Sequence, residues 1–392
     1  MEIIHDRFSL IGTPGEGVGV VDALGRALSI DIVSNEFVPG FDRSTVDGYA
    51  VIASDTFGCS DSIPAVLTLS GEVLMGEAAQ SILRPGACIA VSTGGDLPEH
   101  ADAVVMLEHT EDYGDGLIGI LSPAAPGNNI IFKGDDVSPG DRILSAGKII
   151  TPHDIGILSA LGYCAVGVRR PPVVGVISTG DELVEPSQIP GRGQIRDVNT
   201  PMLEASMARA GAIAENYGII RDEDNSLRDS VKKAVAECDI VLISGGSSAG
   251  MRDLTALVIE SIGEILFHGI AMKPGKPTIL GLIDNKPVFG LPGHPVAAYF
   301  VTELFVRPLV ARLMGAEVQR RSVTARISEA VPSNHGREEY LAVYIDDSAG
   351  TAQPVRGKSG LIASLSHTDG YICIPRDSEG IPALAEVNVT LW

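Results

Sequence analysis

The chain has 392 residues, a formal net charge of −21 at pH 7 and a hydrophobic content of 45%. This hydrophobic content is too high for a disordered chain, and no apolar run approaches the ~20 residues of a membrane span. The negative charge disfavours binding to nucleic acid or to an anionic membrane surface. The length predicts roughly two to four domains with substantial cores.

The N-terminus and the cysteines indicate the compartment. Residues 1–7 include acidic side chains and lack the basic flank and apolar core of a signal peptide, so we expect a cytoplasmic protein. The cysteines are scattered, with no pair at metal-ligand spacing, which argues against a disulfide framework or a zinc site. We expect all five to be buried small hydrophobic side chains: Cys59, Cys88, Cys164, Cys238 and Cys373.

The first third of the chain predicts a helix followed by β structure. Residues 15–32 carry apolar residues at roughly helical spacing, which predicts a helix. Residues 39–51 are polar and glycine-rich before a strand, and Asp47 lies in a turn or beside a polar ligand. Short apolar segments between 51 and 132 predict an all-β insert, for which a small barrel is one arrangement. Within it, the Thr93-Gly94-Gly95 sequence is either an oxyanion-binding loop or a plain hairpin turn.

A second helix is predicted at residues 151–162. Thr151 is a natural N-cap, Pro152 suits the first helical position, and Gly162 is a natural stop. The pattern changes after residues 169–172, which read Arg-Arg-Pro-Pro.

Beyond that boundary, strands alternate with helices. We predict strands at residues 173–178, 212–220, 239–244, 278–282 and 288–291, and helices at 199–211, 226–238, 253–262 and 294–314. This order predicts a parallel sheet covered on both faces, with ligands bound beyond the carboxyl ends of the strands. Residues 316–392 return to an alternating β pattern, which predicts a separate small β domain.

The strand at residues 239–244 runs into a loop of glycine and serine. Its glycines allow close approach of a ligand, and its amides would point at a phosphate or oxyanion at the start of the helix that Asp253 opens. A tight turn without a ligand is the alternative for such a loop. The residues of this anion cradle are Gly245, Gly246, Ser247, Ser248 and Gly250.

Other strand ends add carboxylates and lysines. Ser178-Thr179-Gly180-Asp181-Glu182 ends the first strand of this region, and two Pro/Gly segments, 273–277 and 291–295, flank the last two strands. Carboxylates and loop amides suit a nucleotide phosphate with Mg²⁺, and Lys273 and Lys276 suit an adjacent anion. The prolines beside these lysines exclude a regular helix there. There is no GxxxxGK[ST] and no GxGxxG, so neither a P-loop ATPase nor a Rossmann dehydrogenase fits.

Seven stretches between about residues 30 and 315 make a specific resemblance. In order they are PGFDRSTVDGYAV, STGGDLPEHADAVVMLEHTE, NIIFKGDDVSPGDRIL, VVGVISTGDELVEP, ISGGSSAGMRD, MKPGKP and VFGLPGHPVAA. With them the chain resembles the MoeA/gephyrin E-domain family, molybdopterin molybdenumtransferases that insert molybdate into adenylylated molybdopterin in the last step of molybdenum cofactor synthesis.

The resemblance implies a multi-domain α/β plus β protein. It implies a discontinuous N-terminal dimerisation domain at residues 1–50 and 133–170, with the β insert at 51–132. A three-layer α/β/α molybdenum-cofactor-binding domain follows at 171–315, and a small β-barrel-like domain at 316–392. It also implies a homodimer with composite active sites.

Residue roles follow from the resemblance and from the strand ends. Catalytic roles fall to Asp47, Thr93 and Asp136 of one subunit and to Glu182, Asp222, Lys273 and Lys276 of the other. Asp253, with Glu182, would hold Mg²⁺. Cofactor-binding roles fall to Ser178, Thr179, Gly180, Asp181, Gly245, Gly246, Ser247, Ser248, Gly250, Pro292, Gly293 and Pro295. The chain departs from common family patterns at Gly269, His294 and Ala297.

The implied reaction converts adenylyl-molybdopterin and molybdate to molybdenum cofactor and AMP, through placement and charge neutralisation rather than a protein nucleophile. Tungstate is chemically close to molybdate, so the choice of metal stays open. The implied partners are the adenylyltransferase and molybdoenzymes. Two alternatives remain: a molybdopterin adenylyltransferase, against which the N-terminal 170 residues and the C-terminal domain argue, and a non-catalytic scaffold on the same fold.

Overall fold

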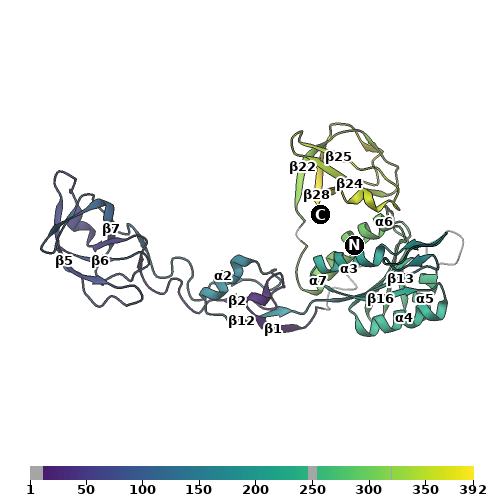
Figure 1. Cartoon of the computed structure of the whole chain (residues 1–392), viewed down its shortest axis with the longest axis horizontal. Helices are drawn as coiled ribbons and strands as arrows, with labels where there is room; N and C mark the ends of the chain where they lie inside the picture. Colours follow the sequence, from purple (N-terminus) through teal and green to yellow (C-terminus); the bar gives the residue numbers. More distant parts are fainter. Residues whose placement is uncertain (1–11, 246–253, 319) are drawn as a thin grey trace. The chain divides into compact units, whose positions relative to one another are not determined.

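The computed structural model describes residues 12–245, 254–318 and 320–392 (Figure 1). The chain divides into two compact units. The insert unit comprises Ile30–Ser145 and Pro152–Ala165, and the main unit comprises Met1–Ser29, Ala146–Thr151 and Val166–Trp392. Across the described residues, every helix is too short or too polar to cross a membrane.

The insert unit contains a six-stranded sheet in its described part. Its order is β7 (Ala103–Met106), β4 (Gly48–Val51), β6 (Ala87–Val91), β5 (Ala65–Val73), β9 (Leu117–Ile120) and β8 (Thr110–Gly114). Buried side chains such as Leu67, Val105 and Ile118 form one of its cores. The predicted β structure is confirmed. The pairings among the described strands do not join β7 to β8, so they form an open sheet rather than a small barrel.

Two short ladders belong to the insert unit outside this sheet. β2 (Ile32–Val33) pairs with β11 (Arg142–Leu144), and β3 (Arg43–Ser44) pairs with β10 (Ile130–Ile131). Helix α2 (Pro152–Ala160) lies where the N-cap and stop signals predict it.

The predicted helix at residues 15–32 is wrong. Residues 15–19 form β1 (Gly15–Gly19), which pairs with β12 (Ala165–Arg169), and only a short 3₁₀ turn, η1 (Val21–Ala23), is helical. Glycine occupies three of the five positions of β1, and each glycine disfavours a helix interior. Leu28 is buried, but it does not lie on a helix. Its amide donates a hydrogen bond to the Lys148 carbonyl, and its backbone forms a β-bridge with Val168.

The main unit is built on a second sheet. Six described strands form it, in the order β16 (Ile213–Ile220), β13 (Val173–Thr179), β17 (Ile240–Gly245), β21 (Lys286–Leu291), β20 (Ile279–Ile283) and β18 (Glu264–His268). The first four are parallel to one another, but β20 pairs antiparallel with β21, and β18 pairs antiparallel with β20, so the sheet is mixed rather than parallel as predicted.

The reversal of β20 comes from a two-residue turn. Asp284 and Asn285, both at positive φ, connect β20 directly to β21. Two such residues make a hairpin, whereas a parallel connection needs a crossover of about a dozen residues. Because Ile279 pairs with Gly290, the segment before β20 lies at the edge where the parallel strands end.

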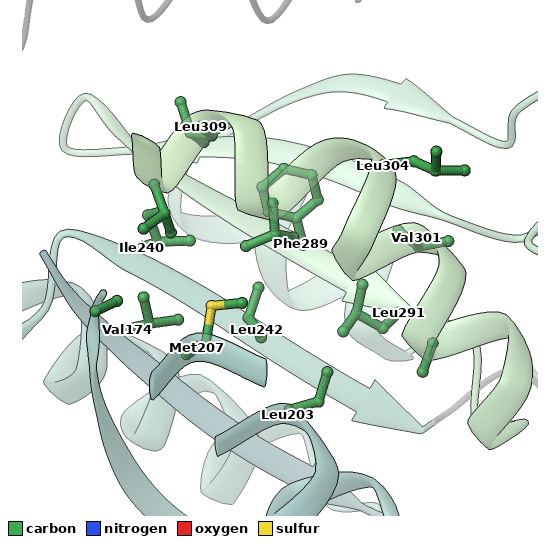
Figure 2. Close-up of a cluster of buried hydrophobic side chains, with 14 of the residues drawn as sticks. Val174, Leu203, Met207, Ile240, Leu242, Phe289, Leu291, Val301, Leu304 and Leu309 are labelled. Carbon is green, nitrogen blue, oxygen red and sulfur yellow. The ribbon is translucent and has the colours of Figure 1, made fainter. Parts of the chain in front are cut away.

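Helices cover both faces of this sheet. The central strand β17 is buried and alternates its side chains. Val241 and Ile243 pack against α4 (Asp224–Glu237) and α5 (Leu254–Ile262). Ile240 and Leu242 belong to the other core, with α3 (Asn199–Arg209), α6 (Pro295–Val301) and α7 (Arg307–Leu313), as Figure 2 shows. A π-helical turn, Thr302–Val306, joins α6 to α7. The three-layer α/β/α prediction is confirmed.

A barrel-like sheet ends the chain. Its described strands close in the order β24 (Glu338–Asp346), β25 (Thr351–Pro354), β22 (Ser322–Ile327), β28 (Glu386–Leu391) and β26 (Gly370–Ile374), which pairs again with β24. A separate ladder joins β23 (Val331–Pro332) to β27 (Gly380–Ile381). The predicted C-terminal β-barrel-like domain is confirmed. One further strand, β19 (Met272–Lys273), joins the barrel at β24 although it precedes β20.

Replacing Leu242 by Ala should destabilise the main unit, because its side chain is fully buried between the sheet and the helices. We expect a loss of about 2–5 kcal/mol in unfolding free energy. Leu257→Ala, at a position 41% exposed on α5, is the matched control and should cost under about 1 kcal/mol. Calorimetric unfolding of both variants measures the difference, and equal losses would contradict the assigned layers.

Candidate functional site

A large acidic cavity lies at the carboxyl edge of the main sheet. It has a volume of about 960 Å³ and is bordered by the ends of β13, β16 and β17. We call it the acidic cavity, because its described lining includes four carboxylates: Asp181, Glu182, Asp197 and Asp222. The short ladder of β14 (Leu183–Val184) and β15 (Ile195–Arg196) forms another part of its wall.

Two neighbouring strand ends bring these carboxylates together. Thr179 ends β13, and its hydroxyl donates a hydrogen bond of 2.6 Å to Asp222 Oδ1, just beyond β16. The Asp222 amide lies 3.4 Å from Asp181 Oδ1. Parallel neighbouring strands end at one edge, which is why residues 41 positions apart meet here. No group of three or more His, Cys, Asp or Glu side chains in the described ranges is arranged to hold a metal ion.

Gly245 forms the part of the cavity lining at the end of β17. Its φ is +126°, and a Cβ there would lie 1.9 Å from the Thr179 carbonyl oxygen, so only glycine fits. Gly180 also lines the cavity. The other predicted cradle residues and the predicted metal ligand lie outside the described residues: Gly246, Ser247, Ser248, Gly250 and Asp253.

The N-terminus of α3 is anchored beneath the cavity. Asp197 Oδ1 accepts hydrogen bonds from the amides of Asn199 and Thr200, at 3.0 and 3.1 Å. Asp197 Oδ2 accepts the Thr200 hydroxyl at 2.6 Å, and Thr200 Oγ1 lies 2.8 Å from Ser178 Oγ. The Ser178 side chain is thus buried in the support of α3, not in the cavity lining where the sequence places it.

Asn199 connects three parts of the site. Its Nδ2 donates to Ser244 Oγ at 2.7 Å and to the Gly293 carbonyl at 2.9 Å, which ties α3 to β17 and to the loop after β21. No sequence motif predicted Asp197, Asn199 or Ser244 as site residues. The Asp-x-Asn spacing before a predicted helix is a capping signal that points to the first two.

A second, basic cavity lies between the main sheet region and the barrel, both parts of the main unit. Its volume is about 660 Å³, and four cationic side chains line it: Lys273, Lys276, Arg337 and Lys358. We call it the basic cavity. Pro292 also lines it, and Pro295 lines the acidic cavity. Gly293 and His294 line both, so the two cavities adjoin.

The two predicted lysines differ in their contacts. Lys273 Nζ lies 2.7 Å from Glu339 Oε1 of the barrel. Within the described parts of the chain, the Lys276 side chain is exposed and has no hydrogen bond or ion pair. His294 Nδ1, in the loop after β21, lies 2.7 Å from Ser359 Oγ, which is a further contact between the sheet region and the C-terminal domain. Nothing in the sequence indicated Arg337, Lys358 and Glu339, because they follow the two lysines by 61 to 85 positions.

The insert unit contains a smaller group of predicted residues. Asp47 Oδ1 accepts hydrogen bonds from the amide and hydroxyl of Thr93, at 2.7 and 3.2 Å. The amides of Gly94 and Gly95 are bonded to the carbonyls of Ser44 and Ser92. This loop is therefore a turn, because its amides are already used within the protein. Asp136 is exposed, with its amide bonded to the Val38 carbonyl, and no described contact joins it to Asp47 or Thr93.

The cysteines take no part in either cavity. Cys88 is fully buried, and burial raises the pKa of its thiol to about 11, which keeps it protonated. Cys238 is also buried, but Cys164 and Cys373 are exposed, so the expectation that all five are buried is wrong. None of them lies among the described lining residues of the two cavities.

Family models match nearly the whole chain. Residues 1–162 match the MoeA N-terminal region (domain I and II), residues 175–312 match a probable molybdopterin binding domain, and residues 324–392 match the MoeA C-terminal region (domain IV).

Individual relatives agree with these matches. The chain is 35% identical to a putative molybdopterin biosynthesis protein of Methanocaldococcus jannaschii, over 95% of this chain and 91% of that protein. It is 33% identical to the molybdopterin molybdenumtransferase of Bacillus subtilis, over 96% and 89%. Its structure is similar to the crystal structure of a molybdopterin biosynthesis MoeA protein from Pyrococcus horikoshii, with a TM-score of 0.85 and 40% identity over 100% and 97% of the two chains.

Asp197→Ala should loosen the start of α3. The substitution removes three hydrogen bonds, and loss of such a cap costs about 0.5–2 kcal/mol. Hydrogen exchange should accelerate at the amides of Asn199 and Thr200, while the rest of the sheet stays protected. Asp229→Ala, on the exposed face of α4, is the control and should leave exchange in α3 unchanged. Unchanged exchange in the Asp197 variant would show that α3 does not depend on this cap.

Proposed function

The chain belongs to the MoeA family of molybdenum cofactor biosynthesis proteins, and we propose that it is a molybdopterin molybdenumtransferase, the enzyme that inserts molybdenum into molybdopterin. The family assignment made from seven sequence stretches is confirmed. The proposed substrates are adenylyl-molybdopterin and molybdate, and the products are molybdenum cofactor and AMP. One observation carries the substrate assignment: two adjoining cavities, one acidic and one basic, share Gly293 and His294.

The acidic cavity suits the adenylated substrate together with a cation. Asp181, Glu182 and Asp222 supply carboxylate oxygens, the donors that Mg²⁺ prefers. Asp253 and Glu182 are the proposed Mg²⁺ ligands, and Asp181 and Asp222 add negative charge to the same cavity. When bound, Mg²⁺ would offset the negative charge of the adenylate phosphate. The carboxylates alone would repel that phosphate, so the donor set fits a cation-dependent site.

The basic cavity suits the tetrahedral dianion. Lys276, Arg337 and Lys358 line it without side-chain partners in the described residues, so their donors are available. Charge-assisted hydrogen bonds to an anion are the strongest neutral-pH contacts these groups make. Molybdate bound there would lie beside the substrate in the adjoining cavity, and binding both in place lowers the entropic cost of their reaction. Tungstate has the same charge and shape and is the alternative anion.

We propose a homodimer with composite sites, in which Asp47 and Thr93 of one subunit act with the main unit of the other. The hydrogen-bonded Asp47–Thr93 pair supports this proposal because it holds an exposed carboxylate in one orientation. Asp136 is the third residue proposed for this half of the site. The proposed setting is the cytoplasm, with the adenylyltransferase and molybdoenzymes as upstream and downstream partners.

The purified chain should release AMP from adenylyl-molybdopterin when molybdate and Mg²⁺ are added. Lys276→Ala should raise the half-saturating molybdate concentration roughly tenfold or more, because it removes one charge-assisted hydrogen bond of about 1.5–3 kcal/mol. Lys232→Ala, on the exposed face of α4, is the control and should change nothing. If the wild-type chain releases no AMP but binds the adenylated substrate, the scaffold alternative is favoured. If it instead forms adenylyl-molybdopterin from ATP, the adenylyltransferase is favoured.

Subunit complementation tests the composite site. At a molybdate concentration far below the half-saturating value, Asp47→Ala and Lys276→Ala should each have low activity, but subunit exchange between them should restore about a quarter of the sites, since half of the dimers are mixed and each carries one intact site. AMP release before and after exchange measures the recovery. No recovery despite mixed dimers detected by mass spectrometry would contradict sites shared between subunits.

A further inference from the structure

Lys273 is held by the barrel as part of a strand. Met272 and Lys273 form β19, which pairs in parallel with β24 so that Lys273 stands opposite Glu339. The Lys273 ammonium lies 2.7 Å from Glu339 Oε1, and Ser333 Oγ donates to Glu339 Oε2 at 2.7 Å. Both oxygens of this carboxylate are therefore engaged.

Burial makes the pair asymmetric. The Glu339 side chain is 12% exposed, whereas the Lys273 side chain is 55% exposed. A nearly buried carboxylate without a cationic partner costs free energy, whereas an exposed ammonium remains solvated. Loss of the pair is therefore more costly for Glu339 than for Lys273. The lysine is consequently committed to its partner before any anion arrives.

The pair also changes the charge of the basic cavity. Glu339 is the one acidic residue among its described lining, beside the four cations. Its charge cancels that of Lys273, which leaves Lys276, Arg337 and Lys358 to attract an anion. A negative charge beside an anion site also weakens binding in proportion to the charge of the anion.

We propose that Glu339 is a positioning residue that sets the oxyanion affinity of the basic cavity by holding and neutralising Lys273. This inference rests on the proposed function, which places the oxyanion in the same cavity. Lys273 then ties the loop to the barrel, and Lys276, three residues later, is the lysine that contacts the anion. Glu339 keeps the affinity moderate, so that a bound dianion is released to the reaction.

A charge-removal cycle on the full-length protein tests the proposal. The variants are Glu339→Gln, Lys273→Met and the double variant, and Glu338→Gln is the matched control on the same strand, outside the cavity lining. Glutamine keeps the volume of Glu339 and an oxygen that accepts from Ser333. The probes are sodium molybdate and sodium perrhenate, tetrahedral anions of charge −2 and −1, measured by equilibrium dialysis without other substrates.

Glu339→Gln should tighten molybdate binding several-fold to roughly tenfold, because it frees the Lys273 ammonium to donate to the anion. The gain should be smaller for perrhenate. Lys273→Met should weaken molybdate binding, and the double variant should return to near the wild-type affinity, because the net charge of the cavity is then restored. Glu338→Gln should change neither affinity.

The opposite pattern would overturn the proposal. If Lys273 binds the anion directly, the double variant stays as weak as Lys273→Met, and Glu339→Gln gives no gain. Should Glu339→Gln fail to fold, the comparison of Lys273→Met with the double variant still decides. Lys276→Met distinguishes a failure of the proposed anion site from a failure of the proposed role of Glu339. If Lys276→Met leaves molybdate binding unchanged, the proposed anion site is wrong. If it weakens molybdate binding but the Glu339 and Lys273 variants do not behave as expected, only the role of Glu339 is wrong.

Discussion

The pairing of β19 with β24 is the constraint on which the basic cavity depends. The same short segment belongs to the barrel at Lys273 and runs on into β20 of the main sheet, so the two sheets meet on one piece of backbone. Arg337 and Lys358 of the barrel can therefore line one cavity with Lys276 of the loop. Hydrogen bonds within the loop, such as those from the Ile270 amide to the Lys276 carbonyl and from the Thr278 hydroxyl to the Gly275 carbonyl, define its shape, and the ladder attaches it to the barrel.

The antiparallel direction of β20 determines where the segment before it lies. Because the Asp284–Asn285 turn sends β21 back beside β20, the start of β20 reaches the edge where β13, β16 and β17 end. Carboxylates lie at the parallel strand ends, and two of the four cations of the basic cavity, Lys273 and Lys276, lie on the loop before the antiparallel strand. Strand direction thus brings these two lysines to the edge where the carboxylates lie, and a net charge of −21 does not prevent a local site for anions.

The sequence predicted the features that depend on residues close together in the chain. Buried runs such as 240–244 and capping signals such as Thr151-Pro152 indicated the strands and helices, and glycine-rich strand ends marked Thr179, Gly245 and Gly293 as neighbours of a cavity. It did not predict what depends on distant pairing. Lys273 appeared equivalent to Lys276, because its partner Glu339 lies 66 positions away in the sequence, on β24. The predicted helix at 15–32 failed for the same reason, since β1 forms only against β12.

The central claim is that the oxyanion and the adenylated substrate occupy separate, adjoining cavities of the main unit. The most direct measurement is a crystal structure with tungstate and AMP bound, with the tungsten located by anomalous scattering. We expect the tungsten peak between Lys276 and Arg337 or Lys358, with Lys273 still paired to Glu339 and AMP beside Asp181 and Asp222. A tungsten peak among the carboxylates of the acidic cavity, with the basic cavity holding no anion, would contradict it.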